Sequence, residues 1–198
     1  QPDGKGWLFA PEGVVDGPLP THYEAQESPV ENPVYRQQKS PTRRVFRRED
    51  NLSAASGSEP GAEVYPVVMT TYRLTEHFHY WTKHNKVNAA LQPEFFVEIS
   101  EQLAAEKGIE KGGWVRVWSK RGEVRAKALV TKRIKPLICD GKPVHVVGIP
   151  LHWGFVGAAK KGWGPNSLTP FVGDANIETP EYKAFLVNIE PSVGEAVS

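Results

Sequence analysis

Residues 113–131, GWVRVWSKRGEVRAKALVT, carry the most regular pattern in this chain. Within this stretch, small apolar residues recur at every second position: Val115, Val117, Val124, Ala126, Ala128 and Val130. A period of two places such side chains on one face of an extended strand. Residues 120–122, Lys-Arg-Gly, interrupt the pattern and supply turn chemistry. The stretch therefore predicts a β-hairpin with one buried face.

Other apolar stretches on either side of this hairpin predict further strands, at 63–71, 95–100, 144–150 and 184–191. A short helix is predicted at 101–108, with Ser100 as its N-cap, Glu101 in its first turn and Gly108 as its left-handed stop. Several non-consecutive strands with one hairpin favour a closed barrel over a βαβ sheet. We predict a mainly β chain with short helices.

Residues 1–62 differ in composition from the rest of the chain. They are rich in Pro and Gly, which disfavour long regular elements. They also hold more large apolar side chains than a free linker usually does, namely Trp7, Leu8, Phe9, Tyr23, Tyr35, Val45 and Phe46. We predict two parts: an extended, largely irregular docking arm at 1–62 and a barrel domain at 63–198.

The composition of the 198 residues narrows the classes of function. A net charge of +1 gives no general attraction to nucleic acid. No apolar run reaches about 18 residues, so we expect no direct membrane insertion. The single cysteine, Cys139, excludes an intrachain disulfide and a cysteine-ligated iron–sulfur cluster within this chain. No signal peptide is recognisable, and the first residue is Gln1, so we expect a processed part or fragment of a longer polypeptide.

The stretch 70–85, TTYRLTEHFHYWTKHN, contains three of the six histidines. His77 and His79 on an extended segment, with His84, could ligate zinc. The fixed cations Arg73 and Lys83 oppose a divalent ion. Structural histidines are a second interpretation. A third is a loop that binds an anion or a heterocycle, because Arg, Thr, His and Lys side chains hydrogen-bond phosphates and polar ring edges.

Two later segments also carry polar chemistry beside glycine and aromatic residues. Residues 149–169, IPLHWGFVGAAKKGWGPNSLT, follow a predicted strand, and glycine lets a backbone approach a ligand closely. A loop of this length in a compact domain is usually functional, although an ordinary surface loop is the alternative. Residues 179–183, TPEYK, add a hydroxyl, a ring and a cation just before the last strand, and alone they fit a solvated turn equally well.

Long ordered motifs in this chain resemble those at the C-terminal end of the large, catalytic subunit of respiratory formate dehydrogenases. The motifs are GWLFAPEGVVDGPLPTHYEAQESPVENP, TTYRLTEHFHYWTKHN, QPEFFVEISEQLAAEKGI, KRGEVRAKALVTKRIKPL, VGIPLHWGF and NSLTPFVGDANIETPEYKAFLVNIE. These enzymes belong to the dimethyl-sulfoxide-reductase family and carry bis-molybdopterin guanine dinucleotide with molybdenum or tungsten. The resemblance implies a double-psi β-barrel that binds the molybdopterin dinucleotide. It is weakest at 36–62.

The resemblance also implies roles for individual residues. The cofactor contacts that it implies are Thr71, Arg73, Thr75, His77, His152, Trp153, Gly154, Asn166, Tyr182 and Lys183. Arg and Lys would neutralise the pyrophosphate, and an aromatic ring can stack on guanine. No residue of this chain is expected to be catalytic or to ligate the metal, because the family takes those residues from earlier domains.

For the assembled enzyme, the resemblance implies two-electron oxidation of formate to CO₂, or the reverse. The implied partners are the remainder of the catalytic subunit and an iron–sulfur electron-transfer subunit that holds the clusters, with a membrane or soluble cytochrome as a further candidate. Anaerobic respiration in the bacterial periplasm is the implied setting, and the chain alone should be inactive. Two alternatives stay open: a stand-alone ligand-binding barrel and a His-ligated zinc hydrolase.

Overall fold

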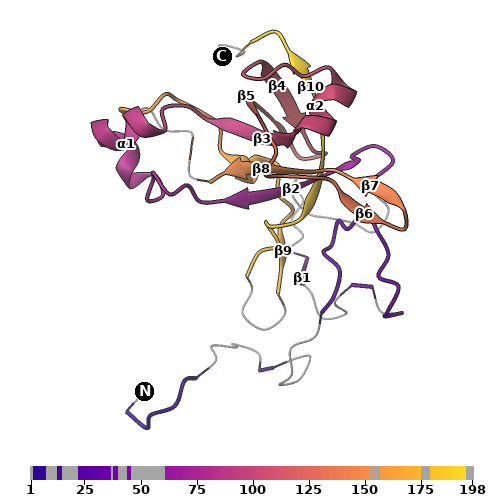
Figure 1. The fold of residues 1–198 in the computed structure, drawn as a ribbon. Coiled ribbons are helices and arrows are strands. Elements are labelled where there is room, and N and C mark those ends of the chain that lie inside the picture. Colours follow the sequence, from indigo (N-terminus) through magenta and orange to yellow (C-terminus); the bar gives the residue numbers. More distant parts are fainter. Residues whose placement is uncertain are drawn as a thin grey trace.

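A closed barrel of six strands forms the body of the molecule in the computed structural model (Figure 1). The structure describes residues 2–7, 13–14, 22–36, 38–39, 44–45, 61–151, 153, 157–174 and 179–194. Around the barrel the order is β10 (Phe185–Ser192), β2 (Val67–Tyr72), β8 (Val146–Pro150), β3 (Phe96–Ser100), β5 (Glu123–Thr131) and β4 (Trp114–Trp118). The predicted mainly β barrel is confirmed.

The barrel mixes parallel and antiparallel strand pairs. Strands β2 and β8 are parallel, as are β3 and β5, whereas the other four pairs are antiparallel. Strand β10 closes the ring by pairing with β2 at its start and with β4 further along. A closed ring leaves the paired backbone groups satisfied and removes the exposed sheet edge.

The predicted hairpin supplies much of the barrel interior. Strands β4 and β5 pair antiparallel, with Val117 opposite Val124. The inward positions are fully buried, at 0–2% exposure: Val115, Val117, Val124, Ala126 and Ala128. Together with Val97, Ile99, Phe185 and Ile189 they form one apolar core. Burial of this alternating set removes apolar surface from water and fixes the register of the hairpin.

The helix α2 (Glu101–Lys107) has the caps that the sequence predicts. The Ser100 hydroxyl accepts a hydrogen bond from the Leu103 amide at 3.0 Å, and Gly108 ends the helix with a φ of 64°. A second helix, α1 (Lys86–Leu91), was not predicted. Asn85 caps it by accepting from the Val87 amide at 2.9 Å, directly after the 3₁₀ turn η1 (Trp81–His84). In Figure 1, α1 lies at one end of the barrel, opposite the β6–β7 hairpin.

A second hairpin, β6 (Leu137–Cys139) and β7 (Lys142–Val144), stands beside the barrel. Asp140 and Gly141 make its two-residue turn, with φ values of 49° and 73°. Positive φ at both central positions is the geometry of a type I′ turn, which Asp-Gly favours. Cys139 is the last residue of β6 and borders this turn.

Parts of the 1–62 segment contact the barrel region. Strand β1 (Arg44–Val45) pairs with β9 (Val172–Gly173), and Glu24 bridges to Lys39 within the segment. Trp7 and Tyr35 are 66% and 54% exposed, so neither ring is packed on the described surface. Of the other apolar side chains singled out there, Tyr23 is half-buried, and Leu8, Phe9, Phe46 and the Val45 side chain lie outside the described structure. No described helix is long and apolar enough to cross a membrane.

Candidate functional site

Three of the predicted cofactor residues meet at the pairing of β2 with the segment before β10. The Thr71 hydroxyl donates a hydrogen bond to the Tyr182 carbonyl at 2.8 Å. The Lys183 ammonium donates in turn to the Thr71 carbonyl and lies 5.3 Å from the centre of the Tyr182 ring. Thr71 and Tyr182 are 111 residues apart in the chain, so the barrel topology brings them together.

Arg73, two residues beyond Thr71 in the chain, acts electrostatically on Lys183. Burial and the charge of Arg73 both lower the pKa of Lys183, with burial the larger cause. No described carboxylate pairs with either side chain, although surface cations elsewhere on the barrel do have such partners, as Arg116 has in Glu123 and Glu190. Two neighbouring cations without a carboxylate favour an anion as their counter-charge.

The buried carboxylate of Glu98 anchors the end of β2 at Tyr72. Tyr72 donates to Glu98 at 3.1 Å, and Thr131 and Arg133 donate to the same carboxylate at 2.9 Å each. Burial raises the pKa of Glu98, but the bonds from Arg133 and Thr131 outweigh it, and the net shift is downward. Burial and the charge of Glu98 raise the pKa of Tyr72, which stays a phenol donor. This network holds the backbone on both sides of Tyr72, and thus Thr71 and Arg73, in place.

His77 and Trp153 form a second group of predicted residues. The rings meet edge to face at 5.5 Å, and both are buried, at 5% and 3% exposure. Both ring nitrogens of His77 have partners, Thr82 Oγ1 at 3.1 Å and the Gln92 carbonyl at 2.8 Å. The Trp153 indole donates to the Lys160 carbonyl at 2.8 Å. This is the geometry of the structural-histidine interpretation, and any cofactor contact by the His77 side chain remains a prediction.

Lys83 belongs to the same group, although it was expected to be only a loop cation. It is 2% exposed, lies 4.4 Å above the Trp153 ring and donates to the His79 carbonyl at 2.7 Å. Burial lowers its pKa to about 8. His79, whose carbonyl accepts from the Lys83 ammonium, has a positive φ of 50°. The loop is thus organised around a buried cation and an aromatic ring.

The remaining predicted residues are separate from these groups or outside the described structure. Asn166 is exposed in the short turn η2 (Pro165–Ser167), and its carbonyl accepts from the Thr169 hydroxyl at 3.1 Å. Thr75 is exposed after the end of β2. His152 and Gly154 lie outside the described residues. Among the residues that are described, no group of three or more His, Cys, Asp or Glu could hold a metal ion.

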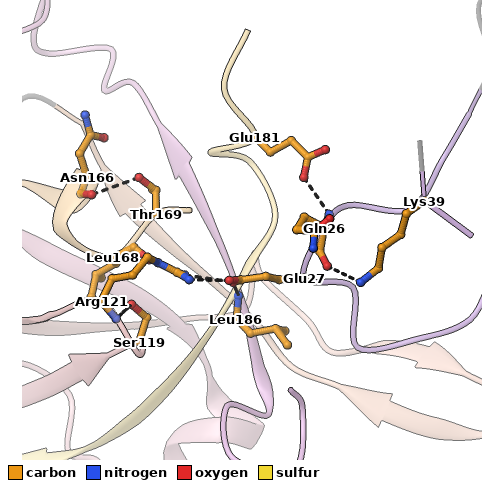
Figure 2. Close-up of polar contacts among 10 residues, drawn as sticks. All are labelled: Gln26, Glu27, Lys39, Ser119, Arg121, Asn166, Leu168, Thr169, Glu181 and Leu186. Carbon is orange, nitrogen blue, oxygen red and sulfur yellow. Dashed lines mark hydrogen bonds and ion pairs between the residues drawn. The ribbon is translucent and has the colours of Figure 1, made fainter. Parts of the chain in front are cut away.

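Sequence reasoning missed the ion pair of Glu27 with Arg121, which Figure 2 shows at the contact of three segments. The two side chains are 15% and 1% exposed, and two hydrogen bonds of 2.5 and 3.0 Å join them. Glu27 is 94 residues from Arg121 in the chain. Neither residue belongs to a local pattern, so only the fold could reveal the pair.

A cavity of about 480 Å³ lies beside this pair. It is lined mainly by apolar atoms of the 22–30 segment, the β6–β7 hairpin and residues 180–184, and Tyr23, Cys139 and Lys183 are among them. The half-buried Tyr23 is therefore the one described aromatic side chain of the 1–62 segment that faces the barrel region.

Comparison with known proteins places this chain in a family. The family model described as "Molydopterin dinucleotide binding domain" matches residues 67–186. The chain is 53% identical over 192 residues to the formate dehydrogenase-O major subunit of Escherichia coli (strain K12), covering 96% of this chain and 18% of that protein. It is 49% identical over 199 residues to the formate dehydrogenase major subunit of Haemophilus influenzae (98% and 19%) and 41% identical over 192 residues to the formate dehydrogenase subunit alpha of Megalodesulfovibrio gigas (96% and 18%). The chain thus spans about a fifth of the length of these relatives. The family model covers more than half of the chain and five of the six barrel strands in full, with only the start of β10. The chain therefore belongs to the Molydopterin dinucleotide binding domain family.

Proposed function

We propose that this chain is the C-terminal cofactor-binding part of a molybdenum or tungsten formate dehydrogenase. In this proposal it positions bis-molybdopterin guanine dinucleotide for the two-electron oxidation of formate to CO₂, or the reverse. Family membership and the similarity to three formate dehydrogenase subunits support it. The site residues of this chain would bind and orient the cofactor, and the cofactor would supply the redox chemistry.

The observation that carries the proposal is the match of the family model over residues 67–186. Within that region the charge of Arg73 acts on Lys183 and lowers its pKa, and no described carboxylate pairs with either side chain. A pyrophosphate is a natural counter-ion for two such cations, because its oxygens accept several hydrogen bonds from guanidinium and ammonium groups. The lowered pKa of Lys183 follows from the cost of burying a charge beside another cation. A bound anion would oppose that effect, because it favours the charged form of Lys183.

The neighbouring groups would orient the bound cofactor. Thr71 ties β2 to the Tyr182 carbonyl, so the Lys183 ammonium and the Tyr182 ring have a fixed relation to Arg73. Thr75, Asn166, His77 and the His152–Gly154 segment are proposed as further contacts. Both ring nitrogens of His77 already have hydrogen-bond partners. His77 would therefore contact the cofactor through its backbone, or its ring would have to give up one of these partners.

The assembled enzyme is proposed to contain parts that this chain lacks. The metal ligand would come from the remainder of the catalytic subunit, and iron–sulfur clusters would lie in partner polypeptides. One relative is called "Formate dehydrogenase 2 subunit alpha (cytochrome c-553)", which supports a cytochrome as an electron-transfer partner. Periplasmic anaerobic respiration is proposed as the setting, and residues 1–62 are proposed as a docking arm.

Replacement of one cation tests the proposed site. In the native complex that contains this chain, Arg73→Ala should lower the affinity for the pterin about 10- to 100-fold, because loss of a charge-assisted contact costs about 1.5–3 kcal/mol. The amount of bound pterin per subunit should fall with it. Bound pterin is measured by fluorescence after oxidative release. Arg36→Ala, which removes an exposed arginine of the 1–62 segment, is the matched control. Equal pterin content in the two variants would contradict the proposed role of Arg73.

A further inference from the structure

The Glu27 carboxylate joins the β4–β5 turn to strand β10, and each of these lies next to a segment with proposed cofactor residues (Figure 2). Both of its oxygens accept from the Arg121 guanidinium, and Oε2 also accepts from the Leu186 amide at 2.9 Å. Glu27 belongs to the 1–62 segment, whereas Arg121 lies in the β4–β5 turn and Leu186 in β10. One carboxylate therefore connects three parts of the chain that are distant in sequence.

On one side, Arg121 extends the connection to the turn that holds Asn166. Its Nε donates to the Leu168 carbonyl at 2.9 Å, and its backbone amide donates to the Ser119 hydroxyl at 3.1 Å. Leu168 is fully buried and follows Asn166 by two residues. A Cβ added to Gly122 would lie 3.0 Å from the Ser167 carbonyl, so the β4–β5 turn packs directly against this segment.

On the other side, the 1–62 segment holds the strand that follows Tyr182 and Lys183. The Leu186 backbone amide donates a hydrogen bond to the Glu27 carboxylate, and the Gln26 backbone amide donates one to the Glu181 carboxylate at 2.7 Å. Tyr182 and Lys183 lie between these two attachments. The Lys39 ammonium donates to the Gln26 carbonyl at 2.6 Å and steadies the 1–62 segment itself (Figure 2).

The burial of the pair makes the connection hard to break. Arg121 is 1% exposed at its side chain, and Nε, Nη1 and Nη2 all have acceptors. Removal of Glu27 would leave a buried guanidinium without its counter-charge and the Leu186 amide without its acceptor. The surrounding backbone would have to move or admit water to satisfy these groups.

We infer that Glu27 is a positioning residue, which through Arg121 and Leu186 fixes the Asn166 turn and the Tyr182–Lys183 segment relative to each other for cofactor binding. The inference rests on the proposed function of those residues. It gives the 1–62 segment a role in the cofactor site through a single carboxylate, without direct contact with the cofactor. At metal sites, loss of a partner that orients a ligand typically weakens binding about 10- to 100-fold, and we expect an effect of this order here.

The test uses the native complex with its cofactor bound. The variants are Glu27→Ala, Glu27→Gln, the exposed control Glu31→Ala and the site variant Arg73→Ala. The rate of pterin loss after dilution is measured for each, and amide hydrogen exchange is followed at 165–169 and 181–186. Glu27→Ala should lose pterin about tenfold faster than Glu31→Ala, with faster exchange at both segments. Glu27→Gln keeps an acceptor for Leu186 but loses the charge, so its rate should lie between them.

Unchanged pterin loss in Glu27→Ala would overturn the inference even if the melting temperature falls, because the pair would then stabilise the fold without serving the site. If Glu27→Ala does not assemble, a rate for Glu27→Gln equal to that of Glu31→Ala would overturn it. Fast loss from Arg73→Ala together with wild-type loss from both Glu27 variants would leave the proposed function standing. Wild-type loss from all the variants would contradict both.

Discussion

Single residues in this chain depend on neighbours that are distant in sequence. Lys83 shows this well: its ammonium is enclosed by the Trp153 ring and the His79 carbonyl, which a solvated loop lysine would not contact. Burial keeps its pKa near 8, whereas the ordinary value is 10.5. The charge is therefore held in the fold at a cost, and that cost depends on pH.

The free energy of unfolding should rise with pH because of Lys83. Between pH 8 and 10.5 the unfolded chain binds a proton at this residue that the folded chain has released. Stability rises with pH wherever the unfolded state binds more protons, so the wild type should gain stability over this range. Lys83→Met, which keeps an apolar stem and cannot titrate, should lack that gain. Denaturant unfolding across this range checks it, and a constant difference between the two proteins would contradict it.

Among the helices and strands, sequence patterns predicted the features that depend on residues close together in the chain. The alternation in β4 and β5, the Ser100 cap and the Gly108 stop each depend on residues within a few positions, and all are present in the structure. The Asn85 cap of α1 and the Asp140–Gly141 turn were also readable signals, but the elements that they bound are only six and three residues long. Glu27 with Arg121 and Tyr72 with Glu98 could not be predicted. Contact of the 1–62 segment with the barrel brings the first pair together, and the strand order of the barrel brings the second.

The segment 157–164 packs against the β3 side of the barrel through a glycine. A Cβ on Gly162 would lie 2.3 Å from Trp153 Cδ1 and 2.6 Å from Phe95 Cβ. Gly162→Ala should therefore lower the free energy of unfolding by about 1–3 kcal/mol through overpacking. Gly164→Ala is the matched control, because nothing lies within 4 Å of its added Cβ and its φ is −78°. Thermal unfolding of both variants checks this, and equal midpoints would show that the contact is not tight.

At the scale of the whole molecule, the surface around η1 and α1 is unusually apolar. Five large side chains there are 42–70% exposed: Phe78, Tyr80, Trp81, Val87 and Leu91. Exposed apolar patches typically mark contacts with another polypeptide. The chain spans about a fifth of its relatives' length, and in the proposed assembly this surface would meet the remainder of the catalytic subunit.

If this chain binds a molybdopterin dinucleotide as part of a larger enzyme, the complex purified through this chain must contain both. Native mass spectrometry of that complex measures its composition. We expect its mass to include molybdopterin guanine dinucleotide and the remaining catalytic and iron–sulfur polypeptide. A complex of this chain without pterin and with stoichiometric zinc would overturn the proposed function.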